Sequence, residues 1–284
     1  ISKKLGNKYF LKFLEMIFKF INIRYLYLID DRREVNVFSK LSRVNKLKVL
    51  IYMHGKFSYK SKKLSKLFFN KYLVWSNFFK KQLLLMNKNY KKENIIVVGN
   101  PILKGKFFNR KSKKYIKIKR CLILDEDYIS FYEIKHFLEN ISKYKNVQFY
   151  YKKKVTRELS RKFESFCSHN NFRIISCNDR MEKIIKKFKI NSIVASTSTG
   201  LLEAPYYNTV PIKFISKDDN RENEFDVFVK EHFVYTAKDK TKFSNLIQKK
   251  YSANKIKIKK TKLWGNKKFE YKNVRKVIDE FTKI

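Results

Sequence analysis

Short runs of β-branched and aromatic residues alternate with longer lysine-rich stretches along most of this 284-residue sequence. The runs have the length of strands, and the intervening stretches carry apolar residues at helical spacing. Strands separated by helices pair in parallel, because each helix returns the chain to the same end of the sheet. The sequence therefore predicts an α/β protein built from parallel sheets.

The first series of strands lies in the N-terminal third of the chain. We expect helices over 34–46 and around 78–86 between its strands, and the series ends at Asn100 and Pro101. The following segment, Lys104–Arg120, is basic and poor in core residues, which is typical of a linker. The predicted strands of this series are Tyr25–Ile29, Lys48–Met53, Tyr72–Trp75 and Ile95–Val98.

A second series follows, and its last part, roughly 225–284, reads as helical and very basic. We therefore expect two Rossmann-like domains facing across a cleft, over residues 1–103 and 121–284. The first domain is short, and because the chain begins at Ile1 rather than Met, it is expected to be truncated. The second series predicts strands Cys121–Leu124, Val147–Tyr151, Phe172–Ser176, Ser192–Ala195 and Val210–Ile215, and helices Ser130–Ser142, Arg157–His169, Arg180–Phe188 and Thr199–Tyr206.

Composition excludes several other classes of protein. A hydrophobic content of 44% supplies a core, so disorder is excluded, and six glycines and three prolines exclude collagen-like or low-complexity chains. No window of 18 uncharged apolar residues predicts a membrane span. Three scattered cysteines form no disulfide framework, which indicates a reducing compartment. Sequence signatures of P-loop enzymes, Rossmann oxidoreductases, zincins and α/β-hydrolases are missing.

The formal net charge of +42 indicates either a polyanionic partner or a codon bias that favours lysine. A strongly basic surface attracts nucleic acid or an anionic membrane face. The alternative is codon bias, because the lysines accompany abundant Asn, Ile, Phe and Tyr. Nucleic acid is disfavoured, since the lysines are spread along the chain and no aromatic RNA-binding motif is present. We expect a cytoplasmic protein bound peripherally to the inner membrane face, with lysines such as those of Lys255–Lys262 facing the lipid.

The segment Asn191–Ile212 carries the strongest chemical signal. A buried strand runs into a turn of hydroxyl residues and glycine, and a helix with an early Glu203 follows. Backbone N–H groups and hydroxyls at the end of a parallel strand suit a phosphate, and Glu203 could accept hydrogen bonds from ribose or sugar hydroxyls. The alternative is that Thr199 only caps the helix and Glu203 is a favourable first-turn charge. The residues of the turn are Ser196, Thr197, Ser198, Thr199 and Gly200.

This segment resembles the donor-binding segment of GT-B glycosyltransferases, in which a strand, a Ser/Thr/Gly turn, a helix with Glu-Ala and an "x-Pro-hydrophobic" strand recur. The order of motifs along the chain is similar to that of bacterial surface-carbohydrate and capsule transferases. It also resembles CDP-glycerol glycerophosphotransferases and UDP-GlcNAc 2-epimerases, which share the two-domain fold. The matching residues are Ser192–Ala195, Ser196–Gly200, Glu203-Ala204, Val210-Pro211-Ile212, His54-Gly55 and Val97–Pro101, within a resemblance that covers roughly residues 25–215.

Three residues of the N-terminal half are candidate catalytic groups. His54 ends a strand before Gly55, and an imidazole there could act as a general acid or base, or could simply cap the strand. Asp30 and Asp31 follow another strand, where either could deprotonate an acceptor hydroxyl. The alternative for this pair is to cap the next helix.

Two charged clusters of the C-terminal half are weaker candidates. Asp125, Glu126 and Asp127 follow a strand, and acidic clusters can bind metal, but no partner carboxylate is identifiable, so no metal site is predicted. Lys153 lies in a lysine triplet where capsule-type transferases often show a His-Pro pair. It could neutralise a diphosphate or belong to a solvated charge run.

The resulting hypothesis is an inverting, metal-independent glycosyltransferase. It would move a sugar from a nucleotide-sugar donor to a surface glycan or glycolipid acceptor, with no cofactor besides the donor. The alternatives are a polyol-phosphate transferase, a nucleotide-sugar epimerase of the same fold, a nucleic-acid-binding protein, and a degenerate, inactive relative.

Overall fold

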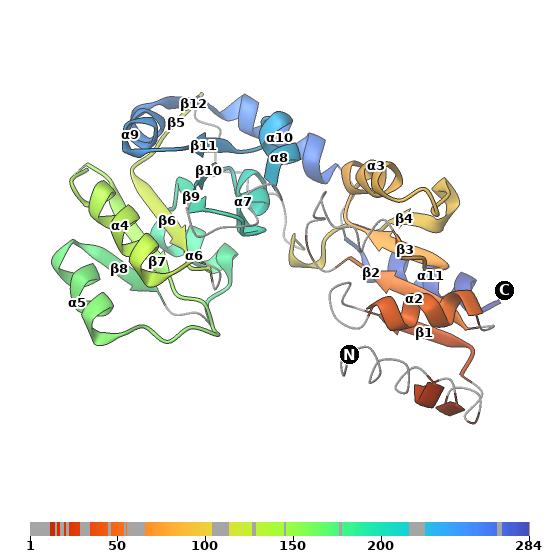
Figure 1. Cartoon of the computed structure of the whole chain (residues 1–284). Coiled ribbons are helices and arrows are strands. Elements are labelled where there is room, and N and C mark those ends of the chain that lie inside the picture. The colour runs from red at the N-terminus through yellow and green to blue at the C-terminus, as the bar shows by residue number, and fades with distance from the viewer. Residues whose placement is uncertain are drawn as a thin grey trace. The chain divides into compact units, whose positions relative to one another are not determined.

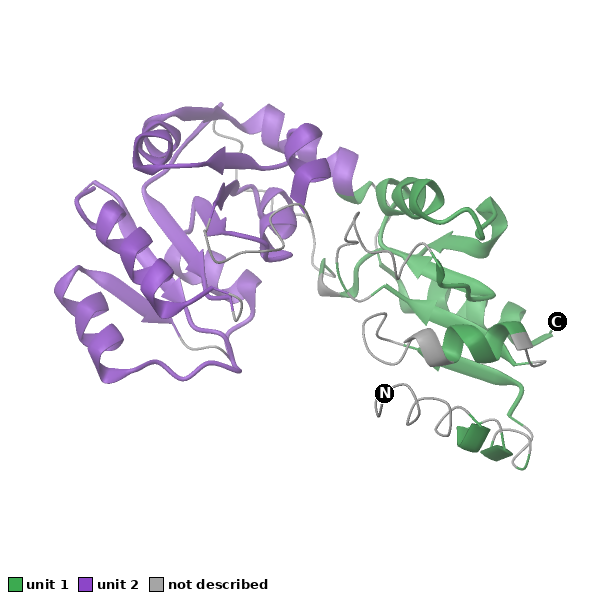
Figure 2. Cartoon of the chain, viewed as in Figure 1, with its two compact units in different colours: residues 1–104, 264–284 green, residues 105–263 purple. Residues whose placement is uncertain are grey.

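The computed structural model contains two α/β units, each with its own parallel sheet (Figure 1). Unit 1 consists of residues 1–104 and 264–284, and unit 2 of residues 105–263 (Figure 2). The residues described are 12–14, 16–17, 20, 23–28, 35–44, 47–53, 55, 66–103, 114–126, 129–144, 146–175, 178–215, 225–265 and 269–283. Within them, no helix is both long and apolar enough to cross a membrane.

Unit 1 is built on four parallel strands in the order β1-β2-β3-β4. These are β1 (Tyr25–Leu28), β2 (Lys48–Tyr52), β3 (Lys71–Val74) and β4 (Ile95–Val97), with the helices α2 (Val35–Val44) and α3 (Asn77–Met86) and the short 3-10 helices η2 (Lys92–Asn94) and η3 (Pro101–Leu103). All four predicted strands are confirmed within one or two residues at each end.

The helix α11 (Tyr271–Lys283) packs on this sheet although it is the last element of the chain. Its Phe281 is buried with Leu50, Leu73 and Val98, which belong to or directly follow the strands. The amphipathic pattern of α11 explains why it needs such a surface. This segment was predicted to belong to the C-terminal domain, 121–284, but it packs on the N-terminal sheet and is part of unit 1.

The backbone of unit 1 bends sharply at Gly99, directly after β4. Its φ of +89° is a conformation that L-residues with side chains rarely adopt. A Cβ atom there would lie 2.8 Å from the backbone N and Cα of Phe269. Glycine therefore lets the segment before α11 approach the end of β4.

Unit 2 contains six parallel strands in the order β11-β10-β9-β6-β7-β8. The chain starts at β6, extends the sheet through β7 to β8, and then returns to place β9 on the other side of β6. This is the strand order of a doubly wound Rossmann sheet, in which the order reverses between β6 and β9. The strands are β6 (Arg120–Leu124), β7 (Gln148–Lys152), β8 (Phe172–Ile175), β9 (Ser192–Ala195), β10 (Val210–Phe214) and β11 (Tyr235–Ala237).

The helices of unit 2 follow the predicted pattern, with local differences that capping explains. The helix α5 starts four residues later than predicted because Ser160 caps it, with its hydroxyl accepting from the N–H of Phe163 at 3.2 Å. These elements are α4 (Phe131–Ser142), α5 (Arg161–His169), α6 (Met181–Phe188), α7 (Gly200–Glu203), the 3-10 helix η4 (Ala204–Tyr207), α8 (Asp226–Lys230), α9 (Lys240–Gln248) and α10 (Ala253–Trp264).

The basic C-terminal part is not purely helical, contrary to the prediction. It also contains β11, which extends the six-stranded sheet, and β12 (Lys250–Ser252), which pairs antiparallel with β5 (Tyr115–Lys117). Both strands are only three residues long, which is too short for a recognisable alternating pattern. The predicted linker also ends earlier than expected, because β5 and Arg120 are already part of unit 2.

Candidate nucleotide-binding site

The candidate site lies where the strand order of unit 2 reverses. In open parallel sheets, ligands bind at the carboxyl ends of the strands on either side of such a point. Here these ends are Asp125 and Glu126 after β6, and Ser196 and Thr197 after β9. The predicted hydroxyl-rich turn therefore occupies the position that this class of sheet uses for ligands.

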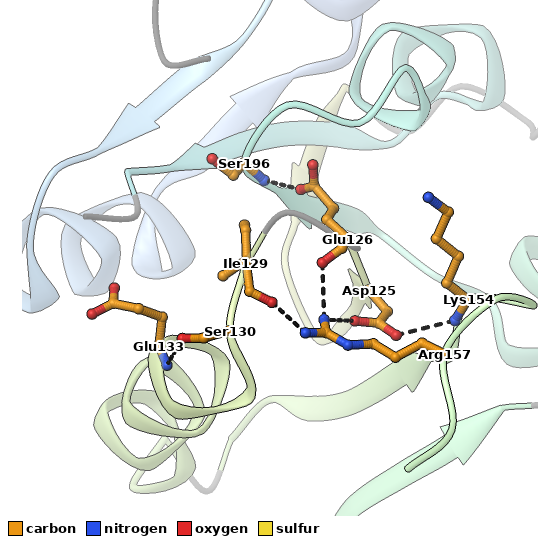
Figure 3. Close-up of polar contacts among 8 residues, drawn as sticks. All are labelled: Asp125, Glu126, Ile129, Ser130, Glu133, Lys154, Arg157 and Ser196. Atoms are coloured by element: carbon orange, nitrogen blue, oxygen red, sulfur yellow. Dashed lines mark hydrogen bonds and ion pairs between the residues drawn. The ribbon is translucent and has the colours of Figure 1, made fainter. Parts of the chain in front are cut away.

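Glu126 from the end of β6 binds the first half of this turn. Its carboxylate accepts a hydrogen bond from the N–H of Ser196 (Figure 3). It also accepts from the N–H of Thr197 at 2.9 Å and from the Thr197 hydroxyl at 2.9 Å. Glu126 is 5% exposed, so these bonds form away from water. Two N–H groups, of Ser196 and Thr197, and the Thr197 hydroxyl are predicted phosphate donors, and the protein itself uses them.

In the second half of the turn, fewer N–H groups are hydrogen-bonded to the protein than in the first half. Gly200 donates its N–H to the Ser198 hydroxyl at 3.2 Å, whereas the N–H groups of Ser198 and Thr199 have no acceptor in the part of the chain that the structure describes. The Thr199 side chain does not cap α7. Thr199 thus stands at the N-cap position of α7, as the alternative expected, but its hydroxyl is not used for capping.

Gly200 packs closely against the end of β6. A Cβ atom at Gly200 would lie 2.5 Å from the Leu124 side chain. The helix that follows is a single α-turn before it becomes 3-10, so its dipole is small.

Glu203 ends α7 as a buried carboxyl group. Glu203 is 7% exposed, and in the described part of the chain its carboxyl oxygens make no hydrogen bond or ion pair. Burial raises the pKa of Glu203 to about 7. A charge without a partner at this depth is unfavourable for stability, so the alternative of a favourable first-turn charge does not describe it.

Asp125 and Arg157 form a second, structural cluster beside the turn. The Arg157 guanidinium lies 2.8 Å from the Asp125 carboxylate, 2.9 Å from the carbonyl oxygen of Glu126 and against that of Ile129 (Figure 3). The N–H of Lys154 also donates to Asp125, at 3.2 Å. The acidic residues that could have suggested a metal are therefore engaged by protein donors, except for Asp127, which lies outside the described residues.

The remaining candidate residues are Lys153, His54, Asp30 and Asp31. Lys153 directly follows β7, where its backbone N–H donates to the carbonyl oxygen of Ile175 at 3.4 Å. Among the described residues, no hydrogen bond or ion pair of its ammonium group indicates a role. His54, Asp30 and Asp31 lie outside the described residues. Their proposed catalytic roles stay predictions.

Sequence reasoning missed Glu126, Arg157 and Lys213 as partners of the site. Lys213, in β10, donates from its ammonium group to the carbonyl oxygen of Ser196 at 3.1 Å. No local spacing indicates these contacts, because they join residues 17 to 71 positions apart. Only a lysine within an otherwise apolar strand, "VPIKFI", offers a signal.

Two parallel α/β units, of which unit 2 has the Rossmann strand order, match the architecture of the GT-B class, and structural comparison confirms that fold. The S. aureus MnaA–UDP co-structure has a TM-score of 0.63 at 12% identity over 99% of this chain and 82% of that one. The UDP-GlcNAc 2-epimerase from Neisseria meningitidis bound to UDP-GlcNAc has 0.58 at 12% identity, over 96% and 80%. The lipopolysaccharide outer core galactosyltransferase WaaB in its apo form has 0.51 at 15% identity, over 100% and 82%.

Comparison of the sequence, unlike that of the structure, found no match. No family model matches the chain, and no curated protein matches it in sequence. The likeness to these structures is one of fold, and fold alone leaves the activity open between sugar transfer and epimerisation.

Proposed function

We propose that the chain is a nucleotide-sugar enzyme, and specifically a glycosyltransferase that acts on a surface glycan or glycolipid. The observation that carries the proposal is the buried carboxyl group of Glu203, which makes no hydrogen bond or ion pair within the described residues and belongs to the helix that follows the turn. Buried polar groups are normally hydrogen-bonded, so an unsatisfied one at a ligand-binding position favours a ligand that supplies the donors. Ribose and sugar hydroxyls are donors of that kind.

In this proposal the N–H groups and hydroxyls of Ser198 and Thr199 bind a phosphate, and Glu203 accepts from a hydroxyl of the ribose or sugar. Lys153 contributes positive charge from the end of β7, two strands away from β9 in the sheet. Donors and lysines that stabilise the leaving nucleotide would support an inverting transfer without a metal. Asp30, Asp31 or His54 would provide the base for the acceptor hydroxyl.

The second candidate is a nucleotide-sugar epimerase, favoured by the structural likeness to UDP-GlcNAc 2-epimerases. Both candidates need the same nucleotide site, so they differ in the fate of the sugar. A transferase releases the nucleotide when an acceptor is present, whereas an epimerase inverts the C2 centre of the sugar without an acceptor.

A two-stage experiment tests the proposal. First, thermal shift against UDP, GDP, CDP, CMP and single-stranded RNA should show stabilisation by one nucleotide class and none by RNA. Stabilisation by RNA alone would refute the proposal. Second, NMR of the matching nucleotide-sugar, with and without a bacterial glycolipid extract, distinguishes acceptor-dependent nucleotide release from epimerisation.

A further inference from the structure

The turn between β9 and α7 is held from both sides by buried charges. Glu126 follows β6 and is 5% exposed, whereas Lys213 lies in β10 and is 2% exposed. Since β6 and β10 are the two neighbours of β9 in the sheet, the two side chains reach the end of β9 from opposite sides.

The two charges bind complementary groups of the backbone. The Glu126 carboxylate accepts from the successive N–H groups of Ser196 and Thr197, and the Lys213 ammonium donates to the Ser196 carbonyl oxygen at 3.1 Å. Successive N–H groups that converge on one anion form a concave anion-binding site. Here the anion is part of the protein, and we call the pair the Glu126–Lys213 clamp.

We infer that the Glu126–Lys213 clamp positions the proposed nucleotide site, leaving the ligand's phosphate to Ser198 and Thr199. This inference rests on the proposed function. Holding Ser196 and Thr197 fixes the direction in which the chain enters the next two residues. Hydrogen bonds to a phosphate depend on direction, so donors that are already oriented bind it without a further ordering cost.

Hydrogen exchange tests the clamp without any ligand. Glu126→Gln places an amide NH₂ against N–H donors, and Lys213→Met removes the ammonium while keeping an apolar chain of similar length. Both variants should accelerate amide exchange at Ser196 and Thr197 by about tenfold or more. Glu139→Gln, on the exposed side of α4, is the matched control and should leave this exchange unchanged. Equal exchange in wild type and clamp variants would overturn the inference.

Ligand affinity tests the positioning role. The dissociation constants of UDP and of uridine, which lacks phosphate, should be measured for each variant that retains the wild-type circular dichroism spectrum. We expect UDP to bind about tenfold or more weakly in both variants, because Ser198 and Thr199 lose the orientation that the clamp gives them, and we expect uridine binding to be unchanged. A general loss of structure would weaken both ligands equally and would contradict the inference.

Two outcomes separate this inference from the proposed function. Tighter UDP binding by Glu126→Gln would mean that Glu126 competes with the phosphate, so the clamp role would be wrong while the nucleotide site stands. Failure of the wild-type chain to bind any nucleotide would instead refute the proposed function, and the positioning role with it.

Discussion

The guanidinium of Arg157 lies 2.8 Å from the carboxylate of Asp125, whose side chain is fully buried. The same guanidinium stacks on Phe131, with 4.1 Å between its central carbon and the ring centroid. This pair joins the loop after β7 to the end of β6. Arg157→Met should lower the free energy of unfolding by about 3–5 kcal/mol, because it leaves a buried carboxylate without its partner.

Urea denaturation checks this value. Arg161→Met, on the exposed start of α5, is the control and should change stability by less than about 0.5 kcal/mol. Asp125→Asn combined with Arg157→Met should recover part of the loss, since the uncompensated charge is gone. A double variant as unstable as the sum of the single ones would show that the two residues act independently.

Gly99→Ala should destabilise unit 1. The positive φ alone costs on the order of 1–3 kcal/mol for a residue with a side chain. The new Cβ would also meet the backbone of Phe269 at 2.8 Å, which displaces the segment before α11. Thermal unfolding should show the loss, with Lys91→Ala on the exposed surface of the same unit as the control. An unchanged melting temperature would contradict the close approach of the two segments.

Stability should depend on pH through Glu203. Its pKa is raised to about 7 from an ordinary value of 4.5, so the folded protein holds this proton more tightly than the unfolded chain. Below pH 4.5 both states are protonated and there is no penalty. Stability then falls as the pH rises to about 7, and stays constant above it, by about 3 kcal/mol at most.

The measurement compares urea unfolding of wild type and Glu203→Gln from pH 4 to pH 8. The variant should gain stability relative to wild type across the window from 4.5 to 7, because glutamine does not ionise. A constant difference between the two proteins over this range would mean that Glu203 has an ordinary pKa.

Nucleotide affinity should depend on Glu203 and Ser198. Glu203→Ala and Ser198→Ala each remove a proposed hydrogen bond to the ligand, worth roughly 1.5–3 kcal/mol when charge-assisted, which is about 10- to 150-fold in affinity. Calorimetry with the nucleotide found by thermal shift measures this loss, and circular dichroism checks the fold. Unchanged affinity in both variants would make the segment a structural turn only.

Membrane binding should be electrostatic if it occurs through the basic surface. The structure refines this prediction: Lys255 and Lys257 of α10 are exposed, whereas Lys260 is buried. Lys255→Gln with Lys257→Gln should reduce co-sedimentation with anionic vesicles about tenfold or more, at roughly 1 kcal/mol per lysine. Lys88→Gln with Lys91→Gln is the control. Equal binding to neutral vesicles at low salt would contradict the prediction, and high salt should weaken binding by screening.

Several elements were predictable because their signals are local. The apolar runs at β2, β6 and β9 are buried in the two sheets, and each is long enough to be recognised as a strand. The hydroxyl-rich turn after β9 was predictable as well, since composition changes abruptly from Ala195 to Ser196. The two-domain Rossmann-like fold followed from the alternation of such elements.

The sequence by itself therefore determined the parallel α/β architecture and the location of the turn, because hydrophobic periodicity acts between near neighbours in the chain. Only the tertiary structure decided which hydrogen-bond donors of that turn are available to a ligand. Glu126 and Lys213 reach Ser196 from strands on either side, and α11 returns to unit 1 from the far end of the chain. Such contacts depend on strand order, and strand order is set by packing the whole sheet rather than by any local pattern.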